Sequence, residues 1–279
     1  MKRIRWLALL FATTLGVCLS MSACSPAPSE RQQLVLTGSS TVAPLIAEIA
    51  ERYQTDHPDV VFDIQTGGSN KGAEDVRAGL NDIGMMSRSL NPDETDLTTF
   101  TIAQDGISIL LNQSAVVNTL ERQQIIDIFT GKVTNWQQVG GNDAPIQVLS
   151  KNVNHATVGL FAKYFELEPE QIVATQLVGD NEEVIETVLG NPAAIGYVSV
   201  GAAEYKIVHG MPLKLMSLEG IAATIRKVSQ GVFPLSRPLN LVTAKAPEGL
   251  EKDFIEFSCS SAVEDIIQAQ AFVPTSVAD

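Results

Sequence analysis

The stretch that decides the fold is LVLTGSSTVAPLIAEIAERY, at residues 34–53 of the 279-residue chain. It begins with the apolar run Leu34–Leu36, which is typical of a short buried strand. After the small and hydroxyl residues of Gly38–Thr41, apolar side chains recur at helical spacing and share one face: Val42, Leu45, Ile46, Ile49 and Tyr53. A strand that leads directly into an amphipathic helix is the repeating unit of α/β folds.

The same alternation of short strands and amphipathic helices continues to the C-terminus. Further strand-like runs stand at 60–64, 83–85, 107–111, 146–149, 175–178, 195–198 and 239–242. Helical patterns lie between them and at 249–257 and 263–270. The sequence therefore predicts an α/β fold.

Loops of small and hydroxyl residues follow three of the predicted strands, at Gly38–Thr41, Gly67–Gly72 and Met86–Ser89. The N-terminus of a helix offers unpaired N–H groups and the positive end of the helix dipole, so such residues can hold an oxyanion there. One loop of this kind is usually an ordinary cap or turn. Three in one half of the chain, one of them containing Arg88, favour a site for an anion or another polar ligand.

The N-terminal segment has the layout of an export signal. Lys2, Arg3 and Arg5 precede an apolar stretch that runs through Leu19, and a small residue precedes Cys24. The arrangement resembles a bacterial lipobox, whose cysteine is lipidated; ordinary cleavage is the alternative. We expect residues 1–23 to be a signal peptide, Cys24 to be the lipidated residue, and residues 24–32 to form a tether.

The chain is strongly acidic, with 32 Asp and Glu against 19 Lys and Arg and a formal net charge of −13. The predicted signal contains three of the basic residues and no acidic one, so its removal gives −16. Such a charge disfavours nucleic acid and anionic membrane surfaces as partners. Three His and three Cys residues disfavour a zinc ribbon or a disulfide framework, and we expect no metal and no cofactor.

The sequence closely resembles the phosphate-binding proteins of bacterial ABC importers, a branch of the periplasmic two-lobed solute-binding superfamily. The segments that carry the resemblance are 38–45, 67–72, 82–88, 105–107, 127–136, 194–198 and 233–239. The resemblance implies two α/β lobes, each a sheet flanked by helices, joined by crossing hinge strands. We expect residues 33–110 and 225–279 to form the first lobe, and 111–224 to form the second, with an anion bound between them.

The resemblance also implies a set of ligand-binding residues. From the first lobe these are Ser40, Thr41, Val42, Ser69, Ser87 and Arg88, where Arg88 could instead meet a lobe-facing carboxylate. From the second lobe they are Lys151, His155 and Thr157. His155 could donate to the anion, or could be only a polar loop residue.

The second-lobe stretch departs from the family pattern of Arg, three residues, then Ser-Gly-Thr. Lys151 replaces the arginine, Val153 stands where an aspartate is common, and His155 and Ala156 replace the serine and glycine. A lysine offers one mobile point charge, whereas an arginine offers a rigid fork for two oxygens. The departures therefore predict altered or weakened anion binding.

Two functions remain in view from the sequence alone. The first is an exported, lipid-anchored, monomeric protein that captures phosphate or a related oxyanion, facing the periplasm or outer surface, and delivers it to an ABC importer permease. The second is a sensor or interaction protein of the same fold with weak anion binding. Catalysis is disfavoured, because the chain has no Gly-x-Ser-x-Gly motif, no metal-ligand spacing and no nucleotide loop.

Overall fold

The computed structural model describes residues 32–275. The predicted signal peptide, Cys24 and nearly all of the predicted tether lie outside the described residues. Within 32–275, no helix is both long and apolar enough to cross a membrane.

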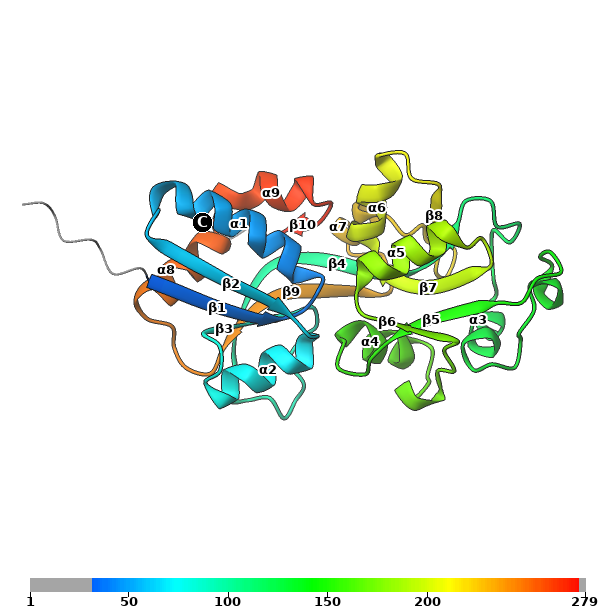
Figure 1. The fold of residues 1–279 in the computed structure, drawn as a ribbon, viewed down its shortest axis with the longest axis horizontal. Helices are drawn as coiled ribbons and strands as arrows, with labels where there is room; N and C mark the ends of the chain where they lie inside the picture. The colour runs from blue at the N-terminus through cyan, green and yellow to red at the C-terminus, as the bar shows by residue number, and fades with distance from the viewer. Residues whose placement is uncertain (1–31, 276–279) are drawn as a thin grey trace, which may run out of the picture. The chain divides into compact units, whose positions relative to one another are not determined.

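The described chain alternates strands and helices as an α/β fold, which confirms the predicted class (Figure 1). The strands are β1 (Gln32–Gly38), β2 (Val60–Thr66), β3 (Ile83–Met86), β4 (Thr98–Asn112), β5 (Gln147–Lys151), β6 (Gln176–Val178), β7 (Ala194–Ser199), β8 (Leu213–Leu215), β9 (Ser236–Thr243) and β10 (Val273–Pro274). The helices are α1 (Val42–Asp56), α2 (Ser69–Ala78), α3 (Arg122–Phe129), α4 (Ala156–Tyr164), α5 (Asn181–Gly190), α6 (Val200–Val208), α7 (Ile225–Ser229), α8 (Gly249–Ser258) and α9 (Glu264–Ala269).

The strands follow one another in the order β2-β1-β3-β9-β4-β7-β5-β6. β1 pairs in parallel with β2 and β3, whereas β9 runs antiparallel to both β3 and β4. β4 is much longer than the predicted strand at 107–111, because it also includes residues 98–106, where polar residues are interspersed with Phe100 and Ile102. β4 and β9 run side by side through the middle of the molecule (Figure 1).

Apolar side chains gather into two main cores on either side of this middle. In the first core, α1, α8 and α9 pack on β1, β3 and β9, and the five residues predicted for one face of α1 are all buried there. The second core includes Phe129, Phe161 and Tyr197. β4 gives Ile102 to the first core and Ile107 to the second, so the chain passes from one core to the other between these two residues.

The loop after β1 requires its glycine. Gly38 has a φ of +136°, and a Cβ at this position would lie 2.3 Å from the carbonyl oxygen of Met85. Because the loop is this tight, the amide of Ser39 donates to that same oxygen at 2.8 Å, and α1 begins three residues later, at Val42. The turn thus brings the start of α1 beside the end of β3.

Candidate functional site

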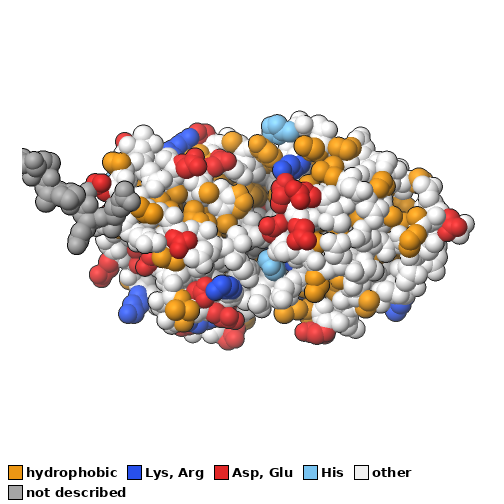
Figure 2. Space-filling model, viewed as in Figure 1, with side chains coloured by type: hydrophobic (Ala, Val, Ile, Leu, Met, Phe, Trp, Pro, Cys, Tyr) orange, Lys and Arg blue, Asp and Glu red, His pale blue; other side chains and the backbone are white. Residues whose placement is uncertain are grey.

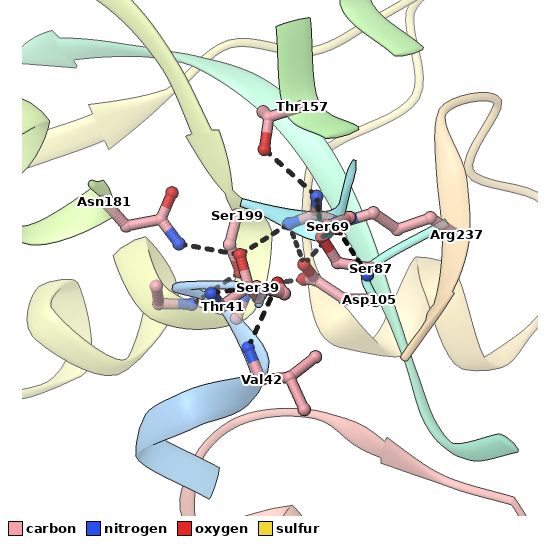
Figure 3. Close-up of polar contacts among 12 residues, drawn as sticks. Ser39, Thr41, Val42, Ser69, Ser87, Asp105, Thr157, Asn181, Ser199 and Arg237 are labelled. Carbon is pink, nitrogen blue, oxygen red and sulfur yellow. Dashed lines mark hydrogen bonds and ion pairs between the residues drawn. The ribbon is translucent and has the colours of Figure 1, made fainter. Parts of the chain in front are cut away.

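Hydroxyl side chains from separate loops converge between the two cores (Figure 3). At the start of α1, the Ser39 hydroxyl accepts hydrogen bonds from the amides of Thr41 and Val42, at 3.2 and 3.4 Å. The Thr41 hydroxyl is buried and accepts from Arg237 on β9 and from Asn181 at the start of α5. The first of the three predicted loops therefore contributes Thr41 to the site.

The second and third predicted loops meet at Ser69 and Ser87. Ser69 is the first residue of α2, and its hydroxyl accepts a hydrogen bond of 3.0 Å from the amide of Ser87, just beyond β3. The two hydroxyl oxygens lie 3.4 Å apart, and both side chains are buried. Because each hydroxyl also has lone pairs and a rotatable proton, this pair can accept from a cation or donate to an anion.

A buried ion pair occupies the middle of the site. Arg237 and Asp105 lie directly opposite each other on β9 and β4, the two strands that run between the cores. Oδ2 of Asp105 accepts from Nη2 and Nε of Arg237 at 2.8 and 3.1 Å, and Oδ1 accepts from the amide of Gly201 at 3.1 Å. Arg237 is 3% exposed and Asp105 is 0% exposed, so both charges are withdrawn from water.

The Arg237 guanidinium joins the hydroxyls of the site to one another. Nη1 donates to the Ser87 and Thr157 hydroxyls, each at 3.1 Å, and Nη2 donates to the Thr41 hydroxyl at 3.1 Å (Figure 3). Thr157 lies at the start of α4, in the second core, whereas Ser87 and Thr41 belong to the first-core side. One side chain therefore contacts polar groups from both sides.

A second buried cation lies beyond Thr41. Nζ of Lys151, at the end of β5, donates to Oδ1 of Asn181 at 2.5 Å, and Nδ2 of Asn181 donates to the Thr41 hydroxyl at 3.0 Å. Lys151 is 3% exposed and no carboxylate within the described residues accepts from it. Burial, and then the nearby charge of Arg237, lower the pKa of Lys151 to about 7.

The electrostatic balance of this polar cluster, which comprises Thr41, Ser69, Ser87, Asp105, Lys151, Thr157, Asn181 and Arg237, favours an anion. With Lys151 protonated, two buried cations face one buried carboxylate, and the remaining polar groups are hydroxyls and an amide. A buried excess of positive charge is costly unless a negative partner compensates it. The arrangement can therefore bind an oxyanion through charge-assisted hydrogen bonds.

The predicted site residues are only partly brought together. Thr41, Ser69, Ser87, Lys151 and Thr157 all belong to the polar cluster, and the amide of Val42 is held at its edge by Ser39. The remaining three predicted residues, Ser40, Arg88 and His155, lie around it.

Arg88 is engaged by a carboxylate of its own side. Its Nη1 and Nη2 donate to the two oxygens of Glu94 at 2.5 and 2.9 Å, and Nη2 also donates to Asn70 at 3.1 Å. The sequence left open a ligand or a lobe-facing carboxylate as the partner of Arg88, and the carboxylate that it contacts in the structure is Glu94, six residues along the chain. The same ion pair lowers the pKa of Glu94 below its ordinary value.

His155 is half-buried at the start of α4 and lines a cavity beside Arg237. Burial, and then the charge of Lys151, lower the pKa of His155 below its usual range. The imidazole is therefore a neutral donor or acceptor near neutral pH rather than a cation.

Arg237, Asp105 and Asn181 were absent from the predicted site. Asp105 and Arg237 lie in segments that carried the family resemblance, but their pairing joins residues 132 positions apart. Asn181 bonds to Thr41 across 140 positions. The available signal was that Asp105 and Arg237 each stand just before a strand-like run. That signal does not show that the two strands pair.

The two sides also meet directly at the rim of the polar cluster. The amide of Asn70 donates to the carbonyl oxygen of Asn154 at 3.2 Å. Gly68 has a φ of +95°, and a Cβ there would lie 2.5 Å from the same oxygen. The loop before α2 therefore approaches the loop before α4 as closely as backbone atoms allow.

Comparisons with known proteins point to one family. A model described as a PBP superfamily domain matches residues 25–262. The chain is 25% identical over 249 residues to the phosphate-binding protein PstS of Bacillus subtilis (strain 168), covering 87% of this chain and 81% of that protein. It is 28% identical over 250 residues to the phosphate-binding protein PstS of Borreliella burgdorferi, covering 85% and 88%.

Solved structures agree with the sequence comparisons. A putative phosphate ABC transporter substrate-binding protein from Clostridium perfringens, crystallised with bound phosphate, has 30% identity and a TM-score of 0.80, covering 88% of this chain and 100% of that one. An ABC-type phosphate transport receptor from Vibrio cholerae has 28% identity and a TM-score of 0.67, with coverage of 88% and 100%.

Proposed function

The chain belongs to the PBP superfamily, and we propose that it is a substrate-binding protein that captures inorganic phosphate for an ABC importer. The family match and the Clostridium structure also confirm the predicted periplasmic-binding-protein fold. Relatives named as phosphate-binding proteins support binding, rather than catalysis, as the function.

The observation that carries this proposal is the buried excess of positive charge between the two cores. Arg237 and protonated Lys151 are cations, Asp105 is the one carboxylate of the polar cluster, and hydroxyls from four chain segments surround them. A phosphate anion would neutralise the excess and accept from several of these donors at once. Each charge-assisted hydrogen bond of this kind contributes about 1.5–3 kcal/mol.

We propose that Arg237 supplies the guanidinium that holds the anion. In the family pattern this arginine stands at the position of Lys151. The guanidinium fork can hold two phosphate oxygens in a fixed geometry, and Asp105 holds the fork in place through Nη2 and Nε. Lys151 would add a second positive charge from the side of Asn181. The departures at Lys151 and Val153 therefore do not leave the site without an arginine.

We propose two lobes, residues 33–110 with 225–279 and residues 111–224. The first core lies within the first of these ranges, and most of the second core comes from the second. Ile107 on β4 and Phe233 just before β9 pack in the second core, so we place the crossing near residues 105 and 237. Phosphate would draw the lobes together, because Thr41 and Thr157 lie on opposite sides of Arg237. Val42 at the start of α1, Ser69 and Ser87 are the further proposed contacts, whereas Ser40, Arg88 and His155 are proposed at the margin.

We further propose that the protein is exported, is lipid-anchored through Cys24 and faces the periplasm or the outer surface. The basic and apolar residues before Cys24 support this proposal. We also propose that the protein is a monomer and that it docks on the permease of an ABC importer.

Isothermal titration calorimetry of the purified protein tests the function. Phosphate should bind at one site with a Kd in the micromolar range or below, and sulfate and molybdate should bind more weakly or not at all. If phosphate, sulfate, phosphonate and molybdate all failed to bind, the protein would instead fit the sensor or interaction role.

A further inference from the structure

Two cavities border the polar cluster at different residues. The α4 cavity, about 560 Å³ in volume, meets the cluster at Arg237 and is lined by α4 and the segment that follows β3. The α5 cavity, about 250 Å³, meets the cluster at Thr41 and Asn181 and is lined by the starts of α1 and α5 and by α6. A small ligand could reach the cluster from either side, and the two mouths differ in charge.

The mouth of the α5 cavity is acidic. Asp180 and Glu182 both line it, and Figure 2 shows acidic side chains gathered over the N-terminal end of α5. Lys206 also lines this cavity, but its Nζ is paired with Glu182 at 2.7 Å. That pair cancels, so Asp180 leaves the mouth with a net negative charge that repels an approaching anion.

The α4 cavity presents donors instead. Its charged and titratable lining residues are Arg88, His155, Lys163 and Arg237, and none of its described lining residues is acidic. Arg88 is neutralised by Glu94, and Arg237 by Asp105. Lys163 is exposed near the end of α4 and forms no salt bridge within residues 32–275, so it gives this mouth a net positive charge.

We propose that the α4 cavity is the entrance through which the oxyanion reaches the site, with Lys163 as its outer contact and Arg237 at its inner end. This inference rests on the proposed function. A protein of net charge −16 would repel a divalent anion on average. Capture therefore depends on a part of the surface where the local charge is positive. Fields focused at a mouth of this kind change association rates by factors of 10 to 10³, and salt screens them over roughly 10 Å.

The first experiment changes the charge of one mouth at a time. Lys163→Glu and the matched control Lys206→Glu each change the charge by two units, and neither residue belongs to the polar cluster. Phosphate association is followed by stopped-flow fluorescence of the tyrosines and Trp136, with Kd from calorimetry. At about 20 mM salt, Lys163→Glu should lower kon about 3- to 10-fold with koff unchanged, and 500 mM salt should remove most of this difference.

The control variant and the contradicting results are defined in the same terms. Lys206→Glu should change kon less than about twofold. A reduction of kon by Lys206→Glu equal to or greater than that by Lys163→Glu would overturn the proposed entrance while leaving the function intact. Failure of the parent protein to bind phosphate in calorimetry would overturn the proposed function itself.

A steric pair provides a readout that does not depend on charge. Gly159 lies on α4 and a Cβ there would meet open space, so Gly159→Phe should narrow the α4 cavity without disturbing the fold. It should slow kon and koff by the same factor and leave Kd unchanged, because a narrowed path affects both directions equally. Ala202→Phe in the α5 cavity is the control and should change neither rate. The reverse pattern would assign the entrance to the α5 cavity.

Discussion

Nη1 of Arg237 donates a hydrogen bond of 3.1 Å to the hydroxyl of Thr157, and this bond joins β9 to the start of α4. Because Nη2 of the same guanidinium donates to Thr41, the side chain contacts both sides of the cleft at once. A ligand that competes for these donors would therefore contact both sides too. The proposed closure and the proposed binding contacts therefore share this one residue.

Replacing Arg237 should abolish tight binding. Arg237→Lys keeps a positive charge opposite Asp105 but loses the fork, and phosphate affinity should fall by at least about 100-fold, since two charge-assisted bonds are lost. Arg88→Lys is the matched control and should stay within about threefold of the parent, because Arg88 contacts Glu94. Calorimetry measures both variants. Equal losses would place Arg88 among the ligand contacts.

Removing one hydroxyl of the polar cluster should weaken binding less than the loss of Arg237. Thr41→Val keeps the shape of the side chain but removes the hydroxyl that accepts from Arg237 and Asn181. We expect phosphate affinity to fall about 10- to 100-fold, which is the loss of one charge-assisted bond. Ser40→Ala, at the margin, should lose less than about threefold. Competitive binding of radiolabelled phosphate measures both, and an unchanged Thr41→Val variant would refute this assignment of the site.

Phosphate binding should take up a proton at Lys151. The pKa of Lys151 is about 7 without an anion, because burial and Arg237 disfavour its charge. A bound anion favours the charged form and raises this pKa, so at pH 8 binding should protonate up to one lysine per protein. Calorimetry in two buffers of different ionisation enthalpy measures the uptake. Lys151→Met should show less uptake, and equal uptake by parent and variant would assign the proton to another group.

Ligand-free stability should increase with pH just above neutrality. The pKa of Lys151 lies near 7 in the folded protein and near 10.5 in the unfolded chain, so unfolding takes up a proton between these values. Its contribution to the free energy of unfolding therefore rises with pH in this window, by at most about 1.4 kcal/mol per pH unit. Urea unfolding at pH 7, 8 and 9 measures the slope. Lys151→Met should reduce the slope; a slope unaffected by this substitution would contradict the assignment.

The sequence predicted the local parts of the fold, and it pointed to several residues that the structure gathers in the polar cluster. The strand, loop and helix of residues 34–53 were predicted because each depends on neighbours within a few positions, and Thr41 follows from that loop. The partner of Thr41 could not be predicted in the same way. Arg237 and Asp105 meet only because β9 and β4 pair in one register, and that register depends on how both cores pack.

Arg88 shows the opposite difficulty. A lone arginine beside a hydroxyl loop indicates an anion site, but the sequence gives no reason to prefer a ligand over Glu94. In the structure Glu94 accepts from Arg88 and also from the amide of Asn91, so this carboxylate is held in place beside the guanidinium. Local motifs thus identified loops that contribute to the polar cluster, while tertiary pairing decided which charged side chains lie in it.

The close approach at Gly68 suggests a variant that is useful in a phosphate sensor. Because a single methyl group at this position would collide with the carbonyl oxygen of Asn154, Gly68→Ala would act as a spacer between the two halves of the molecule. The spacer leaves the side-chain donors of the polar cluster in place. In a fluorescent phosphate sensor built from this protein, the Gly68→Ala variant would serve as a reference. It would contact phosphate but would not complete the proposed closure of the two halves.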